Sequence, residues 1–221
     1  MLHLYQEITL LALRDDKGTV AIDHLAQVLA GALAAELVLK NKISLSNDKK
    51  KFVDLQDASP TGDLLLDECL DKLSNAKRRA KLETWVSRFA SIKRIHHKAA
   101  QSLCQLGILR QDTGKLLLIF NRTIYPEVDP KPESQIVERL EQAIFSSKTD
   151  LSPQDTLLVS LANASGLLSR IFGRKRIKPE RKRIKQIVEG EAVGKATQQV
   201  IEAIQIAIIV TAVIVPVIAS S

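Results

Sequence analysis

Cysteine, tryptophan and methionine are scarce in this sequence, and aromatic residues make up only 4% of it. The two cysteines, Cys69 and Cys104, could pair with each other, but two buried thiols in a reducing cytosol are the simpler interpretation. The first thirteen residues lack a basic stretch and a small-residue cleavage site. We therefore expect no secretory signal.

Catalytic motifs are missing as well. The sequence has no Ser-His-Asp pattern, no phosphate-cradling glycine loop and no paired CxxC motif. Asp63, Asp67, Glu68 and Asp71 could suggest a metal or acid–base site. They lie at the start of a predicted helix, however, where the helix dipole stabilises acidic side chains. We expect these acids to be structural, and we expect no enzyme, no cofactor and no metal site.

Positive charge is concentrated in two parts of the chain. Basic residues outnumber acidic ones, 32 to 25, which gives a net charge of +7. Residues 77–98 and residues 174–185 each hold eight basic residues and one acidic residue, so the remainder carries −7. Clustered charge raises the local potential and favours an anionic partner, such as a lipid headgroup, a membrane surface or nucleic acid. The alternative is that both blocks are only solvated helix faces.

Helical patterns dominate, which predicts a mainly α fold in one domain over residues 1–221. Residues 22–40 are apolar nearly all round, as is typical of a helix buried in a core. Residues 108–120 are predicted to form a β-hairpin around the turn Asp112-Thr113-Gly114. Further helices are predicted over residues 2–13, 63–73, 77–90, 93–106 and 132–145, after Ser152, and over residues 179–190 and 194–215.

The last nineteen residues, 203–221, carry no charge and approach the length of a membrane span. Pro216 interrupts this run, and no basic residue follows it. We prefer a helix packed in the core, with a tail anchor as the alternative.

Five stretches, in this order, resemble the Golgi phosphoprotein 3 family. They are LLALRDDKGTV, GALAAELVLKNKISL, SPTGDLLLDECLDKL, LCQLGILRQDTGKLLLIF and LLVSLANASGLLSRIF, at residues 10–20, 31–45, 59–73, 103–120 and 157–172. The third is the most specific. The resemblance implies a compact helical domain around a hydrophobic central helix with one protruding β-hairpin. It also implies binding of phosphatidylinositol 4-phosphate at Golgi membranes and, in eukaryotes, an adaptor role that retains glycosyltransferases.

The headgroup pocket of that family is only partly matched. Alignment on GALAAELVLK places Ala21 and Ala30 where the family has a tryptophan and an arginine. Alignment on LGIL places Lys93 and His96 where it has two basic residues. The Arg-containing tail that precedes the domain in eukaryotic members has no counterpart here. These departures favour a prokaryotic-type member and leave the lipid specificity open.

The residues themselves predict a headgroup-binding cluster of Lys93, Arg94, His96 and His97. On a helix, Lys93, His96 and His97 would share one face. A phosphomonoester needs several converging donors, and protonated histidines would strengthen its binding at mildly acidic pH. The alternatives are a solvated basic face and, less favoured, a histidine metal site.

An apolar run in the predicted hairpin could contact a membrane, through Leu116, Leu117 and Leu118. A half-buried strand should alternate, so one face of this run needs an apolar partner, which is either the core or a bilayer. In the family, the hairpin is thought to dip into the membrane beside the basic pocket. Shallow insertion and electrostatic attraction are each weak and together give useful binding.

A second basic patch comprises Arg174, Lys175, Arg176 and Arg181, and could contact lipid headgroups or nucleic acid phosphates. No aromatic residue or nucleic-acid-binding signature accompanies it, so nucleic acid is not the expected partner. We therefore expect a cytoplasmic, peripheral membrane protein that binds anionic phospholipid or a phosphoinositide, on the cytosolic face of the Golgi if the source is eukaryotic. Cytosolic tails of membrane enzymes and a second copy of the chain are further candidate partners. The alternatives are a basic helical protein that binds nucleic acid and a protein-interaction scaffold.

Overall fold

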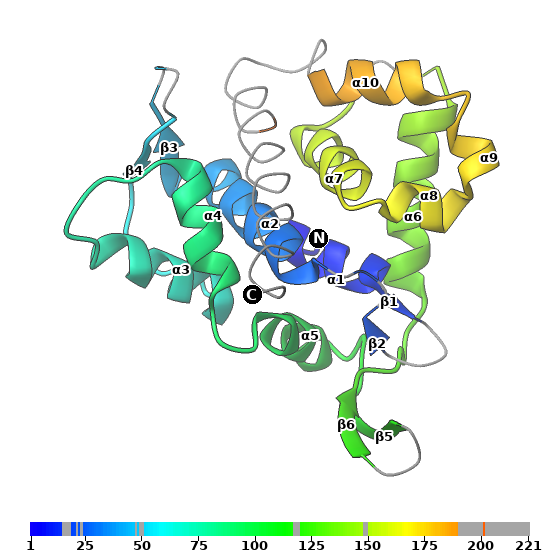
Figure 1. Cartoon of the computed structure of the whole chain (residues 1–221), viewed down its shortest axis with the longest axis horizontal. Coiled ribbons are helices and arrows are strands. Elements are labelled where there is room, and N and C mark those ends of the chain that lie inside the picture. Colours follow the sequence, from blue (N-terminus) through cyan, green and yellow to red (C-terminus); the bar gives the residue numbers. More distant parts are fainter. Residues whose placement is uncertain are drawn as a thin grey trace, which may run out of the picture.

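The computed structural model describes residues 1–14, 19–20, 22, 24–46, 48, 51–116, 120–147, 150–189 and 201. These residues are mainly α-helical, which confirms the predicted fold class (Figure 1). The helices of the described part are α1 (Leu4–Ala12), α2 (Leu25–Leu39), α3 (Leu64–Ser74), α4 (Leu82–Ala90), α5 (Ile95–Gln105), α6 (Lys131–Phe145), α7 (Pro153–Ala164), α8 (Leu167–Phe172), α9 (Arg174–Ile177) and α10 (Arg181–Glu189). Of the last predicted helix, at residues 194–215, the structure describes only Ile201, which is helical and buried.

The strands form three antiparallel pairs within the described residues. The pairs are β1 (Leu13–Arg14) with β2 (Thr19–Val20), β3 (Ile43–Leu45) with β4 (Val53–Leu55), and β5 (Asp112–Leu116) with β6 (Phe120–Ile124). Only the third pair is the predicted protruding hairpin, and Figure 1 shows it extending away from the helices.

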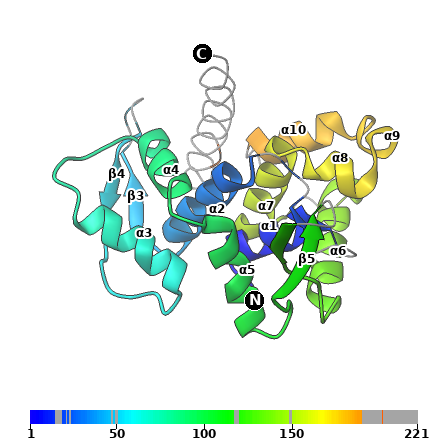
Figure 2. The same cartoon turned by 60° about the horizontal axis from the view of Figure 1, so that its bottom comes forward.

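Helix α2 is the predicted hydrophobic centre of the fold. Alanine and leucine make up most of it, and eleven of its residues are buried. Such a helix is stable only when neighbours cover every side. Helices α1, α4, α5 and α7 pack against it, and in Figures 1 and 2 α1 and α2 lie between a group with α3 and α4 and a group with α6 to α10.

A buried carboxylate on α2 stabilises the start of another helix. Glu36 on α2 accepts hydrogen bonds from the backbone N–H of Leu4 at 2.9 Å and contacts His3 Nδ1 at 2.9 Å. Burial opposes ionisation of Glu36, but these bonds and the nearby Lys40 lower its pKa overall. Glu36 therefore satisfies orphan donors at the amino end of α1 and fixes α1 against α2.

Side-chain caps fix where two of the predicted helices begin. Asp63 precedes α3 and accepts from the backbone N–H groups of Leu65 and Leu66, at 3.0 and 2.9 Å. Ser152 precedes α7 and accepts from Asp155 N–H at 3.1 Å, with Pro153 in the first turn. Both caps satisfy donors that the helix leaves free. Asp63 was predicted to be the first residue of its helix, and in the structure it is the cap that precedes α3.

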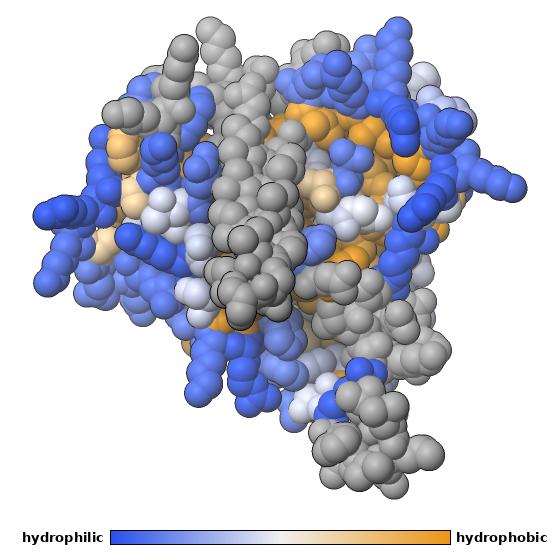
Figure 3. Space-filling view, viewed as in Figure 1, coloured by the Kyte–Doolittle hydropathy of each residue, from blue (hydrophilic) through white to orange (hydrophobic). Residues whose placement is uncertain are grey.

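The surface differs between the two ends of the molecule. In Figure 1 the β5–β6 hairpin lies at the bottom of the view, and α9 and α10 lie at the top right. Near α10, Figure 3 shows hydrophilic side chains projecting around exposed hydrophobic surface.

No helix in the described ranges is long and apolar enough to cross a membrane. The uncharged segment 203–221 is outside those ranges.

Candidate functional site

A basic turn connects α4 to α5. Lys93 and Arg94 are exposed in this turn, between the buried side chains of Ile92 and Ile95, which are 3% and 2% exposed. Arg94 has a φ of 58°, in the left-handed region, so the chain reverses here before α5 begins at Ile95. The prediction that Lys93 shares a helix face with His96 and His97 was wrong, because α5 begins only at Ile95 and Lys93 lies in the turn before it.

Two histidines follow the turn on the first turn of α5. His96 is exposed and His97 is half-buried, with their ring centroids 4.3 Å apart. Partial desolvation lowers the pKa of both rings, and the charge of Arg94 lowers it further. At neutral pH the cations of this cluster are therefore Lys93 and Arg94, and the histidines offer neutral N–H donors.

The amino end of α5 adds to the positive potential of the basic turn. Its first turn contains no acidic residue, and no side chain caps it. The helix dipole there is thus unopposed by a local carboxylate. Among the described residues, Lys93 and Arg94 form no ion pair, whereas Lys98, one turn further on, pairs with Glu68 at 2.5 Å.

The hairpin is present, but its turn lies further along the chain than predicted. Asp112 and Gly114 belong to β5, where they pair with Ile124 and Arg122, and Leu116 pairs with Phe120. Residues 120–124 include β-branched side chains and provide a five-pair ladder, which outweighs the turn signal of Asp-Thr-Gly. Leu116 ends β5, and Leu117 and Leu118 lie outside the described residues, so the predicted membrane contact stays a prediction.

The segment predicted as the first strand instead anchors the base of the hairpin. Ile108 and Leu109 are buried, at 7% and 4% exposure. The backbone of Arg110 donates to Pro126 at 3.0 Å, and Val128 donates to Ile108 at 2.8 Å. These bonds continue the pairing below the ladder and hold the hairpin to the helical core.

Tyr125 joins the hairpin to the basic turn. It directly follows β6, is 4% exposed, and its hydroxyl lies 3.0 Å from Nδ1 of His97. The basic turn, the start of α5 and the hairpin base therefore form one connected surface, which we call the turn–hairpin surface and define by Lys93, Arg94, His96 and the strands β5 and β6. Tyr125 belongs to no motif of the sequence, and the only signal for its role is that an aromatic residue lies close to the predicted hairpin.

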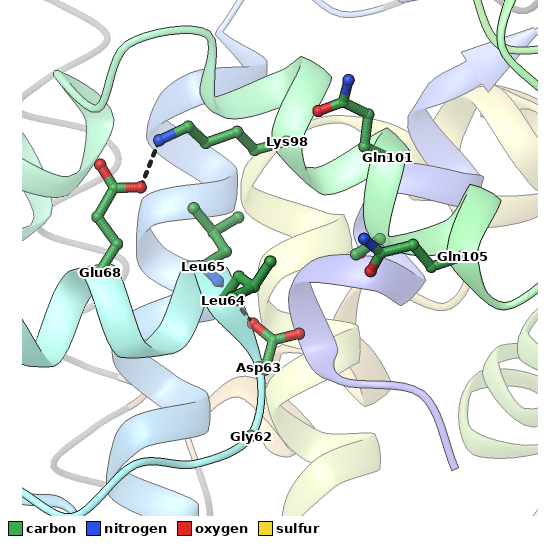
Figure 4. Close-up of a pocket in the computed structure, with 9 residues that line it drawn as sticks. Gly62, Asp63, Leu64, Leu65, Glu68, Lys98, Gln101 and Gln105 are labelled. Carbon is green, nitrogen blue, oxygen red and sulfur yellow. Dashed lines mark hydrogen bonds and ion pairs between the residues drawn. The ribbon is translucent and has the colours of Figure 1, made fainter.

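A pocket of about 350 Å³ lies between α3 and α5 (Figure 4). Its lining is mostly polar, with Asp63, Glu68, Lys98, Gln101 and Gln105 around it. Glu68 and Lys98 pair across one side, which leaves the carboxylate of Asp63 as the unbalanced charge of the lining. The pocket suits a small neutral polar group better than a phosphate.

The acids of α3 have structural partners. Asp63 caps α3 and accepts from the Tyr5 hydroxyl at 2.5 Å. Asp67 accepts from the backbone N–H and the hydroxyl of Thr61, both at 2.6 Å. Slight desolvation opposes ionisation of Asp67, but these bonds lower its pKa overall. Within the described ranges, no three side chains of the usual ligand types form a metal-binding group.

The second basic patch lies at the other end of the molecule from the hairpin (Figure 1). Arg174, Lys175 and Arg181 are exposed there. Arg176 pairs with Glu141 and lies 4.2 Å from the ring centroid of Phe145. It therefore fixes α9 to α6, and the two basic blocks do not form one surface.

The two alanines at the family's pocket positions have different outcomes. Ala30 lies in the middle of α2 and is completely buried. Ala21 lies outside the described residues. Cys69 and Cys104 are both free thiols, but only Cys69 is buried as expected, and Cys104 is half-buried.

Comparison with known proteins identifies a family and relatives of this chain. The family profile described as Golgi phosphoprotein 3 (GPP34) matches residues 4–204. Vacuolar protein sorting-associated protein 74 of Eremothecium gossypii is 22% identical over 170 residues, which cover 68% of this chain and 51% of that protein. The chain thus spans about half the length of this curated relative. The expectation of a prokaryotic-type member finds no support, because the matched relative is a yeast protein.

Proposed function

Because the chain belongs to the Golgi phosphoprotein 3 family, we propose that it binds the surface of membranes containing anionic phospholipid through the turn–hairpin surface. The observation that carries the proposal is the contact between His97 and Tyr125, which places the exposed cations Lys93 and Arg94 beside the hairpin base. The protein acts there as a single non-catalytic domain on the cytosolic face of the membrane.

The physical basis is the sum of two weak terms. A basic residue near an anionic surface contributes about 1 kcal/mol, so Lys93 and Arg94 together contribute about 2 kcal/mol. The uncapped amino end of α5 adds positive potential, which also attracts a phosphate. Insertion of the hairpin tip, which contains Leu117 and Leu118, supplies the apolar term.

The proposed lipid class is an anionic headgroup with a phosphomonoester, of which phosphatidylinositol 4-phosphate is the first candidate by family resemblance. Lys93 and His96 occupy two of the family's four pocket positions, and Ala21 and Ala30 occupy the others. A fully buried alanine offers no donor. We therefore expect the affinity for a membrane to depend more on the negative charge of its surface, and less on the identity of the headgroup, than it would with a complete pocket. An adaptor role toward membrane enzymes is the corresponding proposal for partners.

Vesicle flotation tests this function. The wild type should float with vesicles of phosphatidylcholine that contain phosphatidylinositol 4-phosphate or phosphatidylserine, and not with phosphatidylcholine alone. The double variant Lys93→Glu, Arg94→Glu should bind roughly thirty-fold more weakly or worse, since about 2 kcal/mol of attraction is replaced by repulsion.

A charge-matched control separates this surface from net charge. Lys175→Glu with Lys182→Glu makes the same change in charge at exposed positions on α9 and α10. It should retain binding. Equal loss in the two variants, or equal flotation of the wild type with neutral and anionic vesicles, would reject the proposal.

A further inference from the structure

A groove of about 690 Å³ runs between the corner of α7 and α8 and the helices α9 and α10. Four of its lining side chains are cations and three are aliphatic. The lining residues are Arg174, Lys178, Arg181 and Lys185, then Ile177, Ile184 and Val188, then Asn163 and Ser169. No acidic side chain is among them, so the groove carries an unbalanced positive charge above an apolar floor.

The apolar floor of the groove is packed into the core, and its charged rim is accessible to solvent. Ile177 and Ile184 are 7% and 4% exposed, so they are held in the core while one edge of each lines the groove. The rim cations are all exposed. Only Lys185 forms an ion pair among the described residues, with Glu189 at 3.5 Å, and both of these side chains are mostly exposed, so the pair is weak.

The spacing of the rim matches a helical ligand. The four cations follow one another at intervals of four, three and four residues; Ile177 and Ile184 lie between them, and Val188 follows Lys185 by three residues. This pattern presents an apolar strip flanked by positive charge. An amphipathic helix with an apolar face bordered by carboxylates is its complement.

The position of the groove argues against a bilayer as its ligand. Figure 1 shows α9 and α10 at the far end of the molecule from the β5–β6 hairpin. The orientation of the molecule on a membrane rests on the function proposed above. If the hairpin end faces the membrane, the groove faces away from it. A membrane bound at one end would leave the groove free for a soluble partner.

We infer that the groove binds an acidic, amphipathic helical segment of a partner protein. Apolar side chains of the segment pack on Ile177, Ile184 and Val188, and its carboxylates pair with the rim cations. This site is separate from the turn–hairpin surface, so one chain can contact a membrane and an acidic partner at the same time.

Fluorescence anisotropy with a labelled synthetic helix tests the inference. The probe has leucines along one face and glutamates on both borders, and a second probe has glutamine at every glutamate position. The wild type should bind the glutamate probe and bind the glutamine probe at least roughly tenfold more weakly, because each charged pair contributes at a partly desolvated rim.

The chain offers a closely matched pair of variants. Lys178→Glu with Lys185→Glu reverses two rim charges, whereas Lys175→Glu with Lys182→Glu makes the same change, at the same seven-residue spacing, outside the groove. The first pair should weaken probe binding by roughly tenfold or more, and the second by less than about twofold. Val188→Thr, which keeps the branched shape and replaces one methyl group by a hydroxyl, should weaken it by roughly two- to fivefold. Circular dichroism confirms that each variant is folded.

Three results would overturn the inference. One is the absence of probe binding by the folded wild type up to about 1 mM. Another is an equal loss in the two lysine pairs, which would mean a response to net charge alone. The third is a preference for another anionic ligand. In that case the wild type binds phosphatidylserine vesicles or an oligonucleotide more tightly than the probe, and the groove variant loses that binding. The probe is free in solution, so failure here leaves the flotation result unaffected.

Discussion

The imidazole of His97 and the phenol of Tyr125 form a contact between helix α5 and the end of β6, with Nδ1 3.0 Å from the hydroxyl oxygen and ring centroids 5.7 Å apart. Tyr125 is 4% exposed, so its hydroxyl depends on this partner for satisfaction. The contact couples the orientation of the hairpin to that of the basic turn.

A double-mutant cycle measures that coupling. Tyr125→Phe and His97→Ala should each lower the free energy of unfolding, and the pair should show a coupling energy of about 1 kcal/mol, since each change removes the same hydrogen bond. Urea denaturation gives the four values. Additivity within about 0.3 kcal/mol would mean that the two side chains do not interact in solution.

The same histidines make stability depend on pH. Desolvation and the charge of Arg94 lower the pKa of His96 and His97 in the folded protein. As pH falls below about 6.5, the unfolded chain takes up these protons before the folded one does, so the free energy of unfolding falls with acidification. The loss ends once pH is below the lowered folded-state pKa values.

Comparison with a histidine-free variant isolates this contribution. His96→Gln with His97→Gln should lose less stability than the wild type between about pH 7.5 and 5.5, because the other titrating groups are common to both proteins. Chemical denaturation at several pH values gives the two curves. A parallel decline of the two curves would contradict the lowered pKa of the histidines.

The regular elements were predictable because local sequence signals and burial agree there. The apolar run of α2 could only be satisfied inside a core, and Asp63 and Ser152 provide caps where α3 and α7 begin. Each of these signals acts within a few residues of the element that it specifies.

The site was less predictable because its geometry depends on tertiary packing. No glycine or proline marks the turn at Arg94, whose left-handed backbone lies between the buried side chains of Ile92 and Ile95. The hairpin turn was misplaced because pairing with residues 120–124 outweighs a local Asp-Thr-Gly signal. The groove on α9 and α10 needs the corner of α7 and α8 as its other wall, which no local pattern of residues 174–185 reveals.

A buried ion pair provides a test of the core. Glu7 is 1% exposed, and Arg139 Nη1 lies 2.6 Å from its carboxylate while also contacting Asp155 at 2.7 Å. Burial raises the pKa of Glu7, and the hydrogen bond and charge of Arg139 oppose that rise. Arg139→Met should therefore cost about 2 kcal/mol, below the 3–5 kcal/mol of a fully buried pair, because Arg139 is 27% exposed.

Two controls accompany this measurement. Lys131→Met, at the exposed start of α6, should change the free energy of unfolding by less than about 0.5 kcal/mol. Adding Glu7→Gln to Arg139→Met should recover part of the loss, since no buried carboxylate is left without its cation. A double variant less stable than Arg139→Met alone would show that packing of Glu7, and not its charge, dominates.

The cap of α3 gives an independent prediction. Asp63 accepts from two backbone N–H groups and from the buried hydroxyl of Tyr5. Asp63→Ala should destabilise the protein by about 1–2 kcal/mol, and Asp63→Asn by less, because the amide oxygen can still accept. Asp71→Ala, at an exposed position of the same helix, should stay within about 0.5 kcal/mol of the wild type in thermal or urea unfolding. Equal effects of the alanine and asparagine changes at Asp63 would argue against a capping role.

Salt dependence distinguishes the two terms of membrane binding. The electrostatic term falls as the Debye length shrinks from about 10 Å at 0.1 M salt to about 3 Å at 1 M, whereas apolar insertion does not weaken. Wild-type binding to phosphatidylserine-containing vesicles should therefore decline with salt and then level off. Lys93→Glu with Arg94→Glu should bind weakly at low salt and lose its deficit at high salt, so that the two curves converge, while Lys175→Glu with Lys182→Glu follows the wild type. Curves that stay separated at high salt would show that the first pair of changes acts by disturbing the turn at Arg94, and not through charge.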